Sequence, residues 1–188
     1  ATVLAPVPFF PFTSNVFGTY ARYAAAPHVE DRYGIQVHHP RYFLIPKVGM
    51  HAAPWFLYRS ARAACRRLGL DKTSIDVIDA HYFYPDGVAA ALLAHDLGVP
   101  FVVTARGSDL NVLPEFPAVR RQIVWAAQRA AATITVSGAL KQKLLELGIA
   151  PAKSAVLRNG VDLDLFKPQN REAARRKFGL SGFTLLSV

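Results

Sequence analysis

Residues 76–109, which read DVIDAHYFYPDGVAAALLAHDLGVPFVVTARGSD, decide the fold class of this chain. The stretch predicts a strand over Asp76–Ala80, a helix over Asp86–Leu97 and a second strand over Phe101–Thr104. The aspartate that opens the helix is expected to cap its free amides, and Gly98 to end it with a positive φ. The second strand is apolar without alternation, which is typical of a strand covered on both faces.

The same alternation of strand and helix continues on both sides of this stretch. Since strands and helices follow one another at short intervals, the sequence predicts an α/β fold with a Rossmann-like, doubly wound parallel sheet. The further expected strands are Val3–Pro8, Gly34–His38, Thr133–Val136, Ser154–Leu157 and Phe183–Val188, and the further expected helices are Trp55–Leu68, Glu115–Ala131, Ser137–Gly148 and Asn170–Phe178. Residues 12–34 and 41–54 are expected to be irregular.

Composition narrows the class of protein without choosing a function. The chain has 188 residues, of which 52% are hydrophobic, which suits one domain, or one domain and the start of another. A single cysteine, Cys65, favours a reducing compartment. There is no apolar run of transmembrane length and no signal-peptide pattern, so a cytoplasmic location is expected. The net charge of +9 attracts anions such as nucleic acid, phosphorylated substrates or anionic lipid.

Several common catalytic motifs are absent. No two of the 12 glycines are two residues apart, so the chain has no G-x-G-x-x-G and an NAD-dependent oxidoreductase is disfavoured. The chain also lacks the phosphate-binding P-loop, the H-E-x-x-H zinc motif and the G-x-S-x-G nucleophile motif. The six histidines are scattered without ligand spacing, and no metal site is predicted.

Polar residues stand where the predicted strands end, which is where α/β sheets bind ligands. His81 follows one strand, and it is either a functional group or a histidine bonded to a loop carbonyl. The loop Arg106-Gly107-Ser108-Asp109 follows the next strand and can hold a phosphate and a sugar hydroxyl together. Asp109 could instead be a structural cap paired with Arg106. Asn159-Gly160 follows the last strand of the series and is expected to form a tight turn.

Several of these segments resemble one known family. Glycosyltransferase family 4 joins its two domains by a strand, P-N-G-V-D and F-x-P, and this chain is similar with RNGVD at 158–162 and FKP at 166–168. Further similar segments are DVIDAH at 76–81, YPDG at 84–87, TARGSD at 104–109 and ITVS at 134–137. The resemblance implies one half of a GT-B fold, in which two Rossmann-like domains face each other.

The resemblance also implies a division of the chain. Residues 1–158 would form the N-terminal acceptor domain, 159–170 the connector and 171–188 the start of the C-terminal donor domain. The family's first strand and helix are expected to precede Ala1, and Val3–Pro8 and Ile35–Pro46 to be its next strands. The rest of the donor domain, with its E-x7-E motif, is expected to follow Val188, since no E-x7-E occurs here.

The function implied is a retaining glycosyltransferase of the hexosyltransferase class that needs no cofactor and no metal. Asp109 and His81 would be catalytic, and the substrate-binding residues would be Arg106, Gly107, Ser108, Ser137 and Asn159. Asn159 and Gly160 would form the hinge between the domains. Many family members carry a histidine where Arg106 stands, so this part of the family's pattern is not matched.

The expected partners are a nucleotide-sugar, held by the missing domain, and a glycan or lipid-linked acceptor, with no nucleic acid. The helix over 55–68 pairs aromatic residues with arginines, which suits an anionic surface at the inner face of the membrane, although its apolar stripe equally suits packing on the sheet. Two other functions stay open at this point. They are a nucleotide-sugar epimerase of the same architecture and a non-enzymatic basic module that binds an anionic surface.

Overall fold

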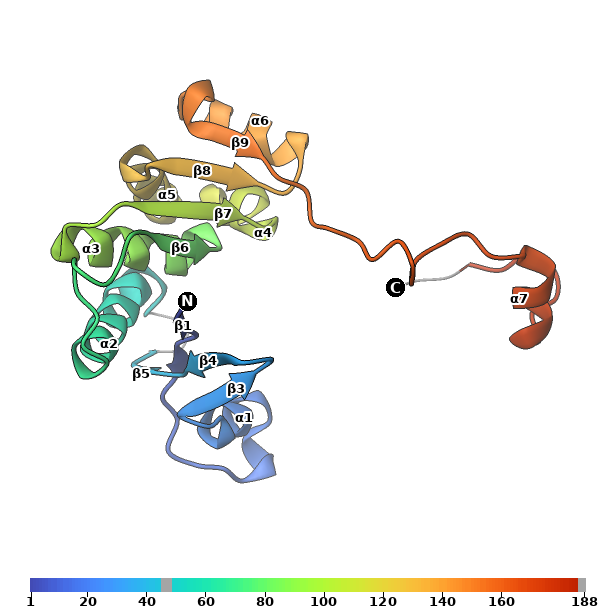
Figure 1. The fold of residues 1–188 in the computed structure, drawn as a ribbon, viewed down its shortest axis with the longest axis horizontal. Helices are drawn as coiled ribbons and strands as arrows, with labels where there is room; N and C mark the ends of the chain where they lie inside the picture. Colours follow the sequence, from blue (N-terminus) through green and yellow to red (C-terminus); the bar gives the residue numbers. More distant parts are fainter. Residues whose placement is uncertain (45–48, 186–188) are drawn as a thin grey trace. The chain divides into compact units, whose positions relative to one another are not determined.

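The computed structural model describes residues 1–44 and 49–185, and the chain divides into two compact units, Ala1–Arg158 and Asn159–Val188 (Figure 1). The roles that the sequence suggests for these parts, as acceptor domain, connector and start of a donor domain, remain predictions.

The first unit is built on a four-stranded parallel sheet in the order β6-β7-β8-β9 (Figure 1). The strands are β6 (Ile78–His81), β7 (Phe101–Ala105), β8 (Ala132–Thr135) and β9 (Ser154–Val156). The helices that connect them are α3 (Val88–Leu97), α4 (Ser108–Asn111) with α5 (Pro117–Arg129), and α6 (Gly138–Glu146). Short 3-10 turns stand at Leu113–Glu115 and Pro151–Lys153. The predicted α/β class is therefore confirmed.

The core lies between this sheet and its helices. Val103 of β7, Ile123 of α5 and Leu144 of α6 are fully buried, and each occupies an apolar position of its element's period. The buried hydroxyls are satisfied within the sheet, since Thr133 Oγ1 pairs with Ser154 Oγ at 2.8 Å. This bond links β8 to β9 and offsets the cost of removing the two hydroxyl groups from water.

Residues before β6 form smaller sheets. β1 (Val3–Leu4) pairs in parallel with β4 (Ile35–His38), which pairs antiparallel with β3 (Val29–Arg32). A second pair joins β2 (Val7–Pro8) to β5 (Arg41–Tyr42). The remaining elements here are the 3-10 turns Asn15–Phe17 and Gly49–Ala52 and the helices α1 (Thr19–Ala25) and α2 (Ala53–Arg67).

The predictions that 12–34 and 41–54 are irregular were wrong in part. α1 carries no long apolar stripe, and it is fixed from outside, because the Arg41 guanidinium donates to the carbonyls of Tyr23 and Ala26 at its carboxyl end. β3 and β4 form a hairpin whose turn, Tyr33-Gly34, has φ of 56° and 82°. The expected strand Ile35–Pro46 runs into residues 45–48, which lie outside the described residues.

The helix predicted over 55–68 is confirmed as α2. Leu57, Ala61 and Ala64 are buried as expected, whereas Leu68 ends the helix and is 38% exposed. Cys65 is also buried, in a small cluster with Ala61 and Leu93, and burial raises the pKa of its thiol. This environment is that of a small buried hydrophobic residue rather than that of a reactive thiol.

The segment between β6 and α3 differs from the predicted simple cap. Residues Phe83–Gly87 form one wide turn, η3, and α3 begins after Gly87 with no side-chain capping bond. The prediction that Asp86 caps this helix was therefore wrong. Gly98, by contrast, ends α3 with φ 69° as predicted.

Replacing Gly87 with alanine is expected to destabilise the fold by about 1 to 3 kcal/mol. A Cβ at this position would lie 2.8 Å from Val103 Cγ2 and 3.2 Å from the Tyr82 carbonyl oxygen, and Val103 is fully buried. Urea denaturation measures the loss. Gly138→Ala is the matched control, because nothing lies within 4 Å of its Cβ position. Equal stability of the two variants would contradict this packing.

The second unit contains α7 (Arg171–Lys177), which Asn170 caps by accepting from the Ala173 amide at 2.9 Å. The predicted turn at Asn159-Gly160 was wrong, because the turn stands at Asp162, whose carboxylate accepts from the amides of Asp164 and Leu165. Residues 183–185 form no strand, and the rest of the strand expected there, 186–188, lies outside the described residues.

Candidate active site

The carboxyl edge of the parallel sheet gathers most of the predicted site. The register sets His81 opposite Thr104 and Ala105 opposite Thr135, so the residues that follow β6, β7 and β8 emerge side by side. His81, the loop 106–109 and Ser137 therefore share one edge of the first unit. Asn159 and Gly160 belong to the second unit.

Asp109 is the organising residue of this edge, and it is completely buried. One carboxylate oxygen accepts from the amide of Gly107 at 2.7 Å and of Arg106 at 3.0 Å, and the other accepts from Phe83 N at 2.9 Å. The carboxylate thus joins the loop after β7 to the loop after β6. Since no solvent reaches Asp109, the expectation that it is a catalytic group does not fit this geometry, and we interpret it as a positioning residue. The alternative, a forward cap of the following helix, does not describe these bonds either.

His81 and Arg106 meet above this buried carboxylate, and both are exposed. Arg106 Nη2 lies 2.8 Å from His81 Nδ1, and His81 Nε2 lies 3.5 Å from Asp79 Oδ2. A guanidinium has only donors, so Nδ1 must accept, which leaves the ring proton of neutral His81 on Nε2, toward Asp79. The site therefore presents a cation beside a neutral imidazole, and this combination suits an anionic ligand that carries or meets a hydroxyl group.

Tyr82 is a site residue that sequence reasoning missed. Its φ of 83° is rare for a residue with a side chain, and such backbone often stands at functional sites. Two bonds hold it there, from Tyr82 N to Thr104 O at 2.8 Å and from Gly87 N to Tyr82 O at 2.9 Å. Its hydroxyl group bonds the Ser108 hydroxyl, so Tyr82 and Ser108 form one exposed polar pair. In the sequence, the only sign of a role for Tyr82 is that an aromatic residue stands directly after a predicted strand.

Two other acidic groups of this loop are shielded from water. Tyr84 is buried and donates to the Met50 carbonyl, and burial raises its pKa to about 12. Asp86 is half-buried, and burial raises the pKa of its carboxyl. Burial, followed by the charge of Asp86, also raises the pKa of Tyr42.

Ser137 and Gly107 both have structural roles. Ser137 caps α6, as expected, by accepting from the Leu140 amide at 3.3 Å. Gly107 has φ 150°, and its amide is one of the groups held by Asp109. Their expected contacts with substrate remain predictions. Among residues 1–44 and 49–185 no group of His, Cys, Asp and Glu is arranged to hold a metal ion.

Comparison with known proteins identifies relatives of one kind. The family described as Glycosyltransferase Family 4 matches residues 15–165. The glycosyltransferase TuaC of Bacillus subtilis, named for teichuronic acid biosynthesis, is 31% identical over 95% of this chain and 46% of its own length. D-inositol 3-phosphate glycosyltransferase 1 of Catenulispora acidiphila is 32% identical over 59% of this chain and 29% of its own length.

Solved structures share the fold at lower identity. Sucrose-phosphate synthase of Thermosynechococcus elongatus has a TM-score of 0.61 and 15% identity, over 84% of this chain and 40% of that one. Anabaena HepE, solved with UDP-glucose, has a TM-score of 0.54 and 19% identity, over 93% of this chain and 42% of that one. This chain thus spans less than half the length of each of these proteins.

Proposed function

This chain belongs to glycosyltransferase family 4, and we propose that it forms the acceptor-side half of a retaining enzyme that transfers a hexose from a nucleotide-sugar. The acceptor would be a glycan or a lipid-linked sugar. The single observation that supports this role most is the exposed pair of Arg106 and His81, held at the carboxyl edge of the sheet by a buried carboxylate. The nucleotide-sugar would be held by a second domain, as the lengths of the relatives suggest.

The chemistry of the pair fits such a transfer. The bond from the anomeric carbon to the diphosphate breaks with its electron pair going to the diphosphate, a bond to the acceptor oxygen forms, and the acceptor hydroxyl gives its proton to His81 Nδ1. Negative charge grows on the leaving diphosphate, and a fixed cation lowers the energy of that state. Arg106 supplies this cation. The bond from the guanidinium to His81 has one charged partner, whereas a bond to phosphate has two and can be bidentate, so a diphosphate competes well with His81 for the guanidinium. His81 Nδ1 then accepts a hydrogen bond from the acceptor hydroxyl.

We further propose that the enzyme needs no metal or cofactor and that it acts at a membrane. No metal or cofactor is required, because the positive groups of the protein stabilise the leaving group. Work at the cytoplasmic face of an anionic membrane is supported by α2, where Trp55 is 47% exposed and Arg59 lies 4.8 Å from its ring. Among the described residues no helix is both long and apolar enough to cross a bilayer.

The proposal predicts that the chain by itself shows no sugar transfer and no micromolar affinity for UDP-glucose or other nucleotide-sugars. A protein extended beyond Val188 by one more domain, about 170 to 200 residues, should release nucleotide from such a donor. Calorimetry with the 188-residue chain and a nucleotide-release assay with both proteins measure this. Turnover or micromolar donor binding by the chain alone would contradict the proposal that a second domain binds the nucleotide-sugar.

A further inference from the structure

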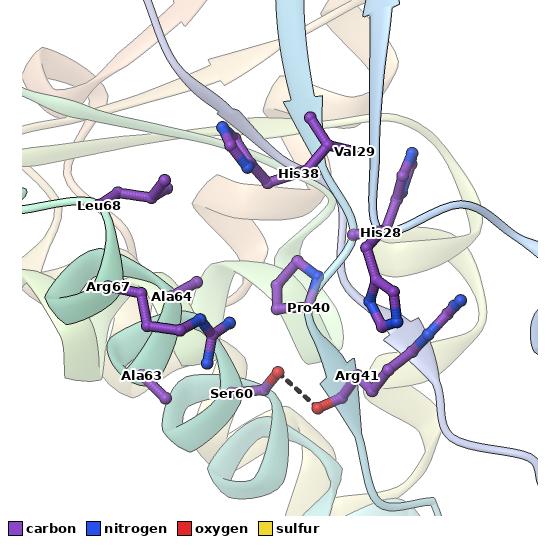
Figure 2. A pocket seen from close by; sticks show the side chains of 11 residues that line it. His28, Val29, His38, Pro40, Arg41, Ser60, Ala63, Ala64, Arg67 and Leu68 are labelled. Atoms are coloured by element: carbon purple, nitrogen blue, oxygen red, sulfur yellow. Dashed lines mark hydrogen bonds between the residues drawn. The ribbon is translucent and has the colours of Figure 1, made fainter.

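A separate pocket lies away from the candidate active site, and Figure 2 shows its lining. It encloses about 620 Å³ between α2 and residues 28–41. Arg67 and Ser60 extend from α2 toward the segment that carries His28 and Arg41 (Figure 2). The chain runs from α2, which lines the pocket, to the first residue of β6, whereas His81 is the last residue of that strand. The pocket and the candidate active site therefore lie toward opposite ends of β6.

The lining of this pocket is basic. Three histidines and two arginines contribute to it, and no aspartate or glutamate lines it along the described parts of the chain. Glu30, which contacts the lining residue His39, is already held, since its Oε1 accepts from Arg32 and from His39, each at 2.9 Å. Positive groups around a concave surface focus their field on its interior and attract anions.

Part of the lining is fixed and part is available. His39 is held from both sides, by Ala5 O and Glu30 Oε1, and Arg41 donates to two carbonyls of the preceding helix region. The side chains of Arg67, His28 and His38, by contrast, have no hydrogen-bond or ion-pair partner among the described residues. The pocket thus combines side chains that are held in place with side chains whose N–H groups can bind a ligand.

We propose that this pocket binds a phosphorylated small molecule, whose phosphate accepts hydrogen bonds from Arg67 and from the rings of His28 and His38. An arginine binds phosphate through two parallel N–H bonds. The volume suits a ligand of sugar-phosphate size rather than a polymer, since small-molecule sites enclose about 300 to 1,000 Å³. Pro40, Ala64 and Leu68 supply an apolar wall for the uncharged part of the ligand.

Calorimetry of the chain with glucose 1-phosphate and with inorganic phosphate tests the proposal. Both should bind with saturation, as seen also by shifts of the His28 and His38 ring signals in NMR, and glucose should not. Arg67→Gln should weaken binding at least tenfold. Arg66→Gln is the matched control, because this neighbouring arginine is exposed and lies outside the pocket lining. Arg106→Gln should leave the phosphate-induced shifts of the His28 and His38 ring signals unchanged, since these residues line the pocket and the candidate active site is separate.

Three results would overturn the proposal. The first is the absence of saturable binding of either phosphate at millimolar concentration. The second is an equal loss of affinity in the Arg67→Gln and Arg66→Gln variants, or a loss in Arg106→Gln alone. The third is binding only to vesicles that contain phosphatidic acid, because this would assign the phosphate to a lipid headgroup. Thermal unfolding of Arg67→Gln should match the parent, since the side chain is exposed and without partners.

Discussion

Asp109→Ala should lower the free energy of unfolding by about 3 kcal/mol or more. The buried carboxylate accepts from the backbone amides of Phe83, Arg106 and Gly107. Removing it leaves these donors without a partner, and each buried unsatisfied group costs about 1 to 3 kcal/mol. Urea denaturation followed by circular dichroism measures the change.

The matched control for this experiment is Asp79→Ala. Asp79 belongs to the same site, but its side chain is 55% exposed, so the stability should change by less than about 0.5 kcal/mol. Asp109→Asn keeps one acceptor oxygen and should lose less than Asp109→Ala. If Asp109→Ala were as stable as the parent and only its activity fell, Asp109 would be a substrate-contacting group and our interpretation of the loop would be wrong.

Arg106→Gln should lower kcat/KM about a hundredfold in the two-domain enzyme, which corresponds to about 2.7 kcal/mol at 1.36 kcal/mol per decade. The guanidinium is the cation that we place against the leaving diphosphate, and glutamine is a shorter polar side chain without the charge. Since Arg106 is exposed, the free energy of unfolding of the variant should be close to that of the parent protein. Steady-state kinetics with a varied donor measure the effect.

Arg120→Gln provides the control, because it removes one exposed arginine from α5 rather than from the sheet edge. Its kcat/KM should equal that of the parent. A hundredfold loss in both variants would point to net charge rather than to a placed cation. An unchanged kcat/KM in Arg106→Gln would remove Arg106 from the catalytic machinery.

The parallel sheet could be predicted from the sequence because β7 is an apolar strand covered on both faces and the helices repeat their apolar residues. Val103 and Ile123 are buried at positions that the apolar pattern of their elements predicts, and Gly98 marks the end of α3 because glycine readily adopts a positive φ. The segment 12–34 could not be predicted in this way. Its helix depends on Arg41, which is distant in the sequence, and its hairpin depends on pairing with Ile35–His38.

The candidate site was predicted as a set of residues but not as an arrangement. Polar residues after adjacent strands indicate the right edge of the sheet, and His81 and Arg106 do meet there. The direction in which a loop carboxylate points cannot be read from the neighbouring residues in the sequence, so Asp109 was expected to be either a catalytic group or a helix cap. It points inward because the amides of two loops converge on it only after β6 pairs with β7.

The most direct test of a retaining sugar transfer is proton NMR of the reaction of the two-domain enzyme with a panel of nucleotide-sugars and candidate glycan acceptors. The account predicts that the anomeric signal of one donor disappears as a glycoside with the same anomeric configuration and a free nucleoside diphosphate form together, with or without a metal chelator. A product of opposite configuration would contradict retention. Conversion of the donor into an epimeric nucleotide-sugar, with no diphosphate released, would contradict transfer itself.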